Sequence, residues 1–172
     1  RVTDGDIDAA LDLANSEGFD ITDTNYAAQV DWGYNQMTLS MSNNKTVDSL
    51  GDMVLPDEDA SIDIMISKIP GKLDKWLGTG WGTGVFRESR LYGPVFYKRF
   101  KGSFQGVELD IEVWPIRSED GAGFDYITEV SFKMDEFADA ASLRAQLYAF
   151  LDQEGVLEHR DSLKTQLVLN RY

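Results

Sequence analysis

The strongest constraint on the fold is a run of alternating apolar and polar residues in the second half of the chain. In the segment 107–114, apolar residues fill the odd positions, and acidic residues fill the even ones up to Trp114. A period of two is typical of a strand with one buried and one polar face. Turn-forming residues separate this strand from neighbours at 95–100 and 126–134. The pattern predicts an antiparallel β-meander, with Pro115 ending its middle strand.

Helical periodicity predicts one helix near each end of the chain. Thr3 is expected to cap the first helix, and Gly18 to end it. The second helix is predicted over 138–153, with Gly155 just beyond its end. Aspartates at positions 4, 6, 8 and 12 lack the glycine and glutamate spacing of a calcium-binding EF-hand, so helix capping is the better interpretation.

The remaining segments complete an α+β prediction. A turn is expected at 56–59 and a glycine-rich loop at 71–84. Additional strands are predicted at 34–41, 61–67 and 165–169. We therefore expect a single domain over 1–172, with a mostly antiparallel sheet of about six or seven strands packed by an N-terminal and a C-terminal helix.

The charge of the chain is concentrated in its first third. The 172 residues carry a formal net charge of −14. Residues 1–66 contain 2 basic and 14 acidic residues, a net charge of −12, whereas residues 67–172 contain 14 basic and 16 acidic residues. Such a field repels nucleic acids and anionic membranes and favours a basic partner. Solubility alone is the competing explanation.

The first functional hypothesis is a non-catalytic acidic protein that binds a basic protein, as inhibitors, immunity-type proteins and nucleic-acid mimics do. It requires no cofactor, and it leaves the oligomeric state open. The tryptophans beside the glycines could form a stacking surface, but aromatic side chains buried within the loop are the better explanation of the pattern. The candidate binding residues are Asp57, Glu58, Asp59, Trp76 and Trp81.

The second hypothesis uses the polar faces of the predicted meander. Carboxylates on alternate residues of one strand supply the oxygen ligands that Mg²⁺ or Mn²⁺ prefers, and basic side chains bind phosphate. Cross-strand ion pairs on a solvated surface are the structural alternative. The candidate metal ligands are Glu108, Asp110, Glu112 and Glu129, and the candidate phosphate ligands are Arg87, Arg90, Lys98, Lys101 and Lys133.

This arrangement resembles the triphosphate-tunnel (CYTH) enzymes, whose signature is Glu-x-Glu-x-Lys on a strand. In this chain the corresponding residues are Glu129, Ser131 and Lys133, so the central glutamate is a serine. The motif also lies far from the N-terminus, where that family has it. The resemblance implies a metal-dependent phosphohydrolase, but it is not sufficient to assign the chain to the family.

The chain lacks the residues that several other classes of catalytic or metal site require. The chain has no cysteine, which excludes disulfides, thiolate catalysis and cysteine-ligated metals. Its single histidine, His159, lies in a polar segment without a nucleophile motif. The chain starts at Arg1 rather than Met, so we expect that a leader or a cloning segment was removed. No run of about 18 apolar residues is present, so we expect a soluble protein, either cytoplasmic or exported, and the sequence leaves the compartment open.

Overall fold

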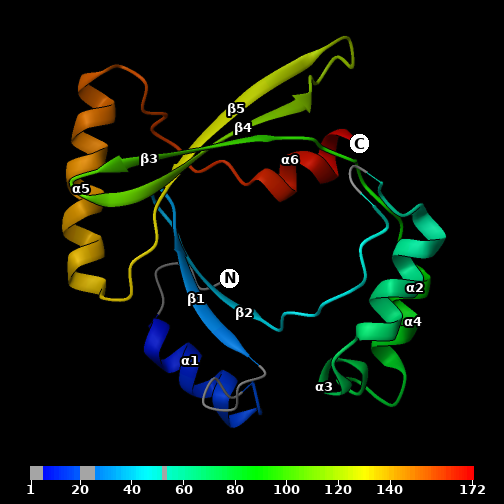
Figure 1. Cartoon of the computed structure of the whole chain (residues 1–172). Coiled ribbons are helices and arrows are strands. Elements are labelled where there is room, and N and C mark those ends of the chain that lie inside the picture. Colours follow the sequence, from blue (N-terminus) through cyan, green and yellow to red (C-terminus); the bar gives the residue numbers. More distant parts are fainter. Residues whose placement is uncertain (1–5, 20–25, 52–53) are drawn as a thin grey trace. The chain divides into compact units, whose positions relative to one another are not determined.

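The computed structural model describes residues 6–19, 26–51 and 54–172, and it is α+β. The chain divides into two compact units, 1–91 and 92–172 (Figure 1). The single domain expected over the whole chain stays a prediction. In order, the first unit contains α1 (Ile7–Ser16), β1 (Ala27–Trp32), β2 (Met37–Ser42), α2 (Glu58–Lys68), α3 (Gly71–Asp74) and α4 (Trp81–Arg87). The second contains β3 (Lys98–Phe104), β4 (Val107–Arg117), β5 (Phe124–Ser131), α5 (Phe137–Gln153) and α6 (Lys164–Arg171).

The N-terminal helix α1 forms where the sequence predicts it. Its cap is Asp6, whose carboxylate accepts a hydrogen bond from the Ala9 amide at 3.0 Å. The expected cap, Thr3, lies outside the described residues. Gly18 follows the helix in a left-handed conformation with φ of 83°, as a glycine after a helix end commonly does. Strands β1 and β2 form an antiparallel pair beside this helix.

Helix α2 replaces the turn predicted at 56–59 and the strand predicted at 61–67. The carboxylate of Asp57 accepts a hydrogen bond from the Ala60 amide at 2.9 Å and thereby caps the helix. Glu58 and Asp59 in the first turn favour the positive end of the helix dipole. Isoleucines at every second residue are typical of a strand and do not share one helix face, so the Asp57 cap and the acidic first turn are the local signals for the helix.

The glycine-rich segment 71–84 is not a loop, because α3 lies inside it and α4 begins within it. Gly80 turns the chain between the two helices in a left-handed conformation with φ of 80°. Gly82 is buried where α4 meets α3, and a side chain there would strike Ile69 and the backbone of Asp74. The glycines therefore allow a tight helical corner, and their low helix propensity concealed it.

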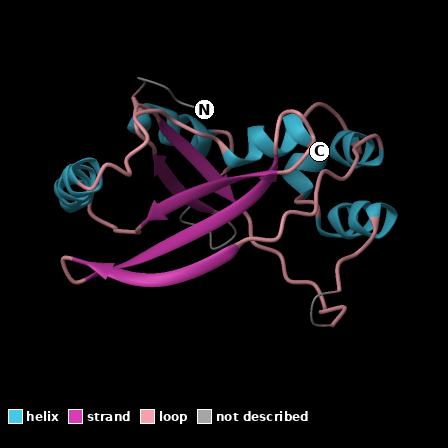
Figure 2. Cartoon of the chain, turned by 90° about the horizontal axis from the view of Figure 1, so that it is seen from above, coloured by secondary structure: helices cyan, strands magenta, loops and turns pink. Residues whose placement is uncertain are grey.

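The second unit is built on a three-stranded antiparallel sheet in the order β3-β4-β5. Figure 2 draws the strands of the chain in magenta. Gln105 and Gly106, with φ of 51° and 81°, join β3 to β4 in a two-residue turn of the kind that suits twisted hairpins. Strand β4 continues through Pro115 to Arg117, so the predicted end at Pro115 is wrong. Proline removes one amide donor but keeps the backbone extended.

The described residues contain five strands in two sheets, fewer than the six or seven expected. Part of the difference is α6, a helix where a strand was predicted over 165–169. The long helix α5 confirms the prediction for 138–153, and it buries Leu143 and Leu147. Leu109 and Ile116 are the buried apolar side chains of β4. None of the helices that the structure describes is long and apolar enough to cross a membrane.

Candidate functional site

The densest group of charged side chains in the second unit lies on the even-numbered face of β4. Glu112 is at its centre, with only 6% of its surface exposed. The register places Arg99 of β3 on one side of Glu112 and Glu129 of β5 on the other. Helix α6 lies against the same strand and contributes Lys164. We call Arg99, Glu112, Glu129 and Lys164 the sheet-face network.

Both carboxylate oxygens of Glu112 accept hydrogen bonds. Oε1 accepts from Arg99 Nε at 2.9 Å and from Arg99 Nη2 at 2.6 Å. Oε2 accepts from Trp114 Nε1 at 2.9 Å and from Lys164 Nζ at 2.9 Å. Because charge-assisted hydrogen bonds are stronger than neutral ones, these donors hold the carboxylate in its ionised form.

The protonation of Glu112 follows from two opposing effects. Burial raises the pKa of its carboxyl, but hydrogen bonds from Lys164, Arg99 and Trp114 outweigh burial and lower the pKa to about 2. Burial also lowers the pKa of Lys164, and its bonds to Glu112 and Glu129 reverse this and leave it raised. Both groups therefore stay charged at neutral pH.

Lys164 is the member of the network that sequence reasoning missed. Its Nζ also donates to Glu129 Oε1 at 3.0 Å, so that it joins two carboxylates on adjacent strands. The ammonium group lies 4.6 Å from the centre of the Trp114 ring, a favourable cation–π distance. The contact depends on the packing of α6 against β4, so no local pattern of the sequence indicates it.

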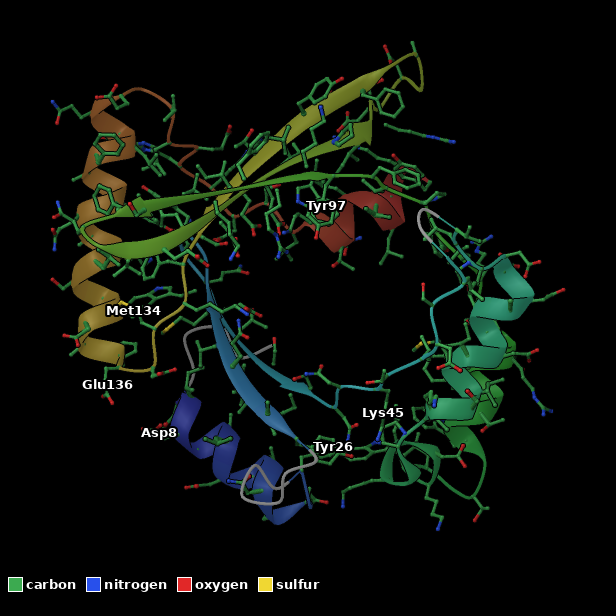
Figure 3. The ribbon with its side chains drawn as sticks, viewed as in Figure 1. Asp8, Tyr26, Lys45, Tyr97, Met134 and Glu136 are labelled. Atoms are coloured by element: carbon green, nitrogen blue, oxygen red, sulfur yellow. The ribbon has the colours of Figure 1, made fainter. Side chains whose placement is uncertain are left out.

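Aromatic rings border the network. Tyr97 and Trp114 stack in parallel, with ring centres 4.3 Å apart and planes at 2°. Arg99 Nη2 donates to the Tyr97 hydroxyl at 3.2 Å. Figure 3 labels Tyr97 beside the sheet of the second unit. The stack therefore connects to the network through Trp114 Nε1, which donates to Glu112, and through the Tyr97 hydroxyl, which accepts from Arg99.

The other predicted ligands on the sheet have separate environments. Lys101 Nζ lies 2.6 Å from Glu108 Oε1 in an ion pair between two exposed side chains. Asp110 faces Lys101 across the register, and its Oδ1 is buried without a hydrogen-bond partner. Lys98 and Lys133 are exposed. The cross-strand ion pairs suggested by the sequence are therefore present on this face.

The arrangement places cations between the carboxylates. Among the described residues, no three His, Cys, Asp or Glu side chains are grouped as a metal ion requires. Glu112 and Glu129 meet at Lys164, and Glu108 meets Lys101. Chemically, this face can hold α6 on the sheet and fix the positions of its charged groups.

The acidic residues of the first unit have a different environment. Asp57 caps α2, and Glu58 Oε2 accepts a hydrogen bond from the Leu91 amide at 3.0 Å. Asp59 is exposed, as is Asp63 one turn later. Neither of these two carboxylates makes an ion pair with any residue that the structure describes.

Helix α1 repeats this pattern with Asp8 and Asp12. Both side chains are exposed, and within the described parts of the chain neither has an ion-pair partner. Figure 3 labels Asp8 on this helix. The two pairs, Asp8 with Asp12 and Asp59 with Asp63, are each spaced by four residues, so both members share one helix face. We call these four residues the acidic helix faces.

The predicted tryptophans and arginines of the first unit lie on its later helices. Trp76 is 47% exposed, and its ring centre lies 5.3 Å from that of Phe19. Trp81 is half-buried as the first residue of α4. Arg87 and Arg90 are exposed at the end of that helix, in a different unit from Lys98, Lys101 and Lys133.

The start of α4 is already occupied by a protein carboxylate. Asp74 Oδ1 accepts a hydrogen bond from the Thr83 amide at 2.8 Å. This bond lowers the pKa of Asp74, so the negative charge remains there at neutral pH. The glycine-rich segment thus directs an amide toward Asp74, in the manner of a helix cap.

His159 is engaged in a local contact. Its Nε2 lies 2.7 Å from Asp152 Oδ1, and both side chains are exposed.

Comparison of the chain with protein-family models, with curated proteins and with solved structures gives no match.

Proposed function

We propose that the protein is a non-catalytic acidic binding protein that recognises a basic protein through its first unit. The observation that carries the proposal is the contrast between the sheet of the second unit and the acidic helix faces of the first. The second unit compensates carboxylates on its sheet with Arg99, Lys101 and Lys164. The acidic helix faces of the first unit have no such partners among the described residues.

Uncompensated like charges on a helix face are unfavourable within the chain. A like-charged pair four residues apart destabilises a helix by about 0.2–0.5 kcal/mol. A partner that brings lysine or arginine to these faces relieves this repulsion. The same field raises the rate of encounter with a basic partner, and salt screens it.

The test compares two variants that remove the same charge from different units. Asp59→Asn with Asp63→Asn neutralises one acidic helix face. Asp135→Asn with Glu136→Gln removes two exposed acids before α5 (Figure 3 labels Glu136). Each protein is immobilised and exposed at low salt to a lysate of its own source, and the retained proteins are identified.

We expect the parent chain and the control variant to retain a protein of high isoelectric point. The variant of the acidic helix face should retain much less of it, and Asp8→Asn with Asp12→Asn tests the second face in the same way. Equal retention by all variants would contradict the proposal, as would the absence of any retained protein from the parent chain.

The metal-dependent phosphohydrolase is the alternative, and it stays a prediction. It rests on the several basic and acidic side chains that share one sheet face, and it requires a metal ion to displace Lys101 and Lys164 from the carboxylates that they now contact. Its test is incubation with Mg²⁺ or Mn²⁺ and tripolyphosphate. Phosphate release with an increase in melting temperature would support it, and the absence of both would remove it.

A further inference from the structure

A cavity of about 680 Å³ lies between the β4–β5 turn and the end of α6, entirely within the second unit. That volume falls in the range of small-molecule sites. The turn forms one wall, and α6 forms the other. The lining includes Arg117, Glu119, Phe124, Leu167, Asn170 and Arg171.

Arg171 connects the two walls of the cavity. Its Nη1 donates to the Arg117 carbonyl at 3.0 Å and to Asp125 Oδ2 at 2.6 Å. Its Nη2 reaches Glu119 Oε1 only at 3.4 Å, beyond the usual range of a strong hydrogen bond. The Arg171 side chain is 13% exposed, whereas that of Glu119 is 87% exposed. The contact with Glu119 is therefore the weak one.

The geometry leaves one edge of the Arg171 guanidinium available. Its Nε–H has no acceptor among the described residues, and Nη2 has only the long contact with Glu119. Nε and Nη2 lie on the same edge of the guanidinium. These two donors form the planar fork that matches a carboxylate. Because Nη1 is fixed by Asp125 and the Arg117 carbonyl, the fork is held in place before any ligand binds.

Further groups of the cavity suit the same ligand. Arg117 is a lining residue whose exposed side chain can bring a second positive charge to the opening, although its guanidinium now lies 4.8 Å from the Tyr172 ring centre. Asn170 uses its carbonyl oxygen to accept from Gln166 at 2.8 Å, which leaves its amide N–H groups as donors. Leu167 and Phe124, the latter 57% exposed, supply apolar surface.

The turn that forms the first wall is held by its own hydrogen bonds. Asp120 Oδ1 accepts from Ser118 Oγ at 2.6 Å and from the Ala122 amide at 2.9 Å. The Gly123 amide donates to Ser118 Oγ at 3.0 Å. Asp120 is thus occupied inside the turn, and the wall is preformed.

We propose that this cavity binds a small molecule that carries a carboxylate and an apolar group, with Arg171 and Arg117 holding the carboxylate. Glu119 occupies part of the Arg171 edge in the free protein, and the ligand carboxylate displaces it. This site is independent of the acidic helix faces, since it lies in the other unit and takes a ligand of opposite charge.

Benzoate is the probe, and benzylamine is its counterpart of similar shape and opposite charge. Each is titrated into the whole chain, and backbone amide shifts are followed by NMR. We expect benzoate to give saturable shifts concentrated in 117–124 and 167–171, and benzylamine to give none there. Absence of saturable benzoate shifts in these segments would overturn the proposal.

Three variants separate the contributions of the lining residues. Glu119→Gln removes the competing carboxylate and should tighten benzoate binding about two- to fivefold, the range of an exposed ion pair. Arg117→Gln should weaken it about tenfold. Arg160→Gln, which changes an exposed arginine paired with Glu158 outside the cavity, should leave it unchanged.

Arg171→Gln is expected to abolish binding, but it also removes a contact between α6 and the sheet. If Arg171→Gln fails to fold, the weaker binding expected for Arg117→Gln still tests the proposal. Weaker benzoate binding in Glu119→Gln, or tighter benzylamine binding in the parent chain, would identify a site for cations and would overturn the assignment.

Discussion

Lys164 Nζ lies 2.9 Å from Glu112 Oε2, and this contact joins the last helix to the central strand of the three-stranded sheet. Lysine and glutamate are 52 residues apart in the chain. Glu112 is buried, and three different side chains donate hydrogen bonds to its carboxylate. Desolvation of such a carboxylate is unfavourable, so each donor matters.

Replacement of Lys164 by methionine should destabilise the chain by about 3 kcal/mol, the usual effect of removing one partner from a buried ion pair. The loss leaves Glu112 and Glu129 opposite each other without the cation between them. Urea unfolding followed by circular dichroism measures the change. Adding Glu129→Gln should recover part of the stability, and a Lys164→Met variant as stable as the parent would contradict the role of the bridge.

Glu112 should make the chain less stable in acid. Its pKa is about 2 in the folded chain against an ordinary value of 4.5. A lowered folded pKa contributes stability that is fully present above pH 4.5 and is lost as pH falls toward 2. The shift corresponds to about 3 kcal/mol in total.

The measurement for this acid effect is the urea midpoint between pH 6 and the acid range. Glu112→Gln should lower the midpoint at pH 6 and flatten its pH dependence relative to the parent chain. Glu108→Gln, on the same strand but exposed, is the matched control and should follow the parent curve. Parallel curves for Glu112→Gln and the parent would show that Glu112 is not the responsible group.

Gly82 and Gly84 of α4 should respond in opposite directions to alanine. A Cβ at Gly82 would lie 3.0 Å from Asp74 Cα and 3.1 Å from the Leu73 carbonyl oxygen, whereas one at Gly84 meets no atom within 4 Å. Gly82→Ala should therefore destabilise the helical corner by about 1–3 kcal/mol. Gly84→Ala should stabilise it by about 0.5–1 kcal/mol, the gain in helix propensity.

Hydrogen exchange of amides in 58–91 reports on this corner directly. Both variants replace a glycine of α4 by alanine, so both gain helix propensity. Only Gly82→Ala also introduces a steric contact with α3. Equal exchange rates in both variants would contradict the close approach of α3 and α4.

The sequence predicted the elements whose signals are local. Alternation identified β4, and helical periodicity identified α5. The strands beside β4 were expected with other bounds, at 95–100 against the observed Lys98–Phe104 and at 126–134 against Phe124–Ser131. Isoleucine at 62, 64 and 66 misled the prediction of α2, because β-branched residues at alternate positions are typical of a strand and do not share one face of a helix. The Asp57 cap was the signal that distinguished the two.

Other features depend on contacts between distant segments. The pairing of Arg99 with Glu112 follows from strand register. Because basic residues lie on the neighbouring strand, the sequence predicted that cross-strand ion pairs would form, but not which residues would pair. Lys164 was not found because its segment was assigned to a strand instead of a helix. The cavity beside Arg171 arises from a turn and a helix nearly fifty residues apart, which no local pattern records.

The salt dependence of partner association tests recognition by the acidic helix faces most directly. With the captured basic protein immobilised, the association rate constant of the parent chain is measured over a series of NaCl concentrations. We predict a steep fall with salt for the parent, and a slower, flatter dependence for a variant with Asp8, Asp12, Asp59 and Asp63 all changed to asparagine. Rates that do not vary with salt, or that are the same for both proteins, would contradict this mode of recognition.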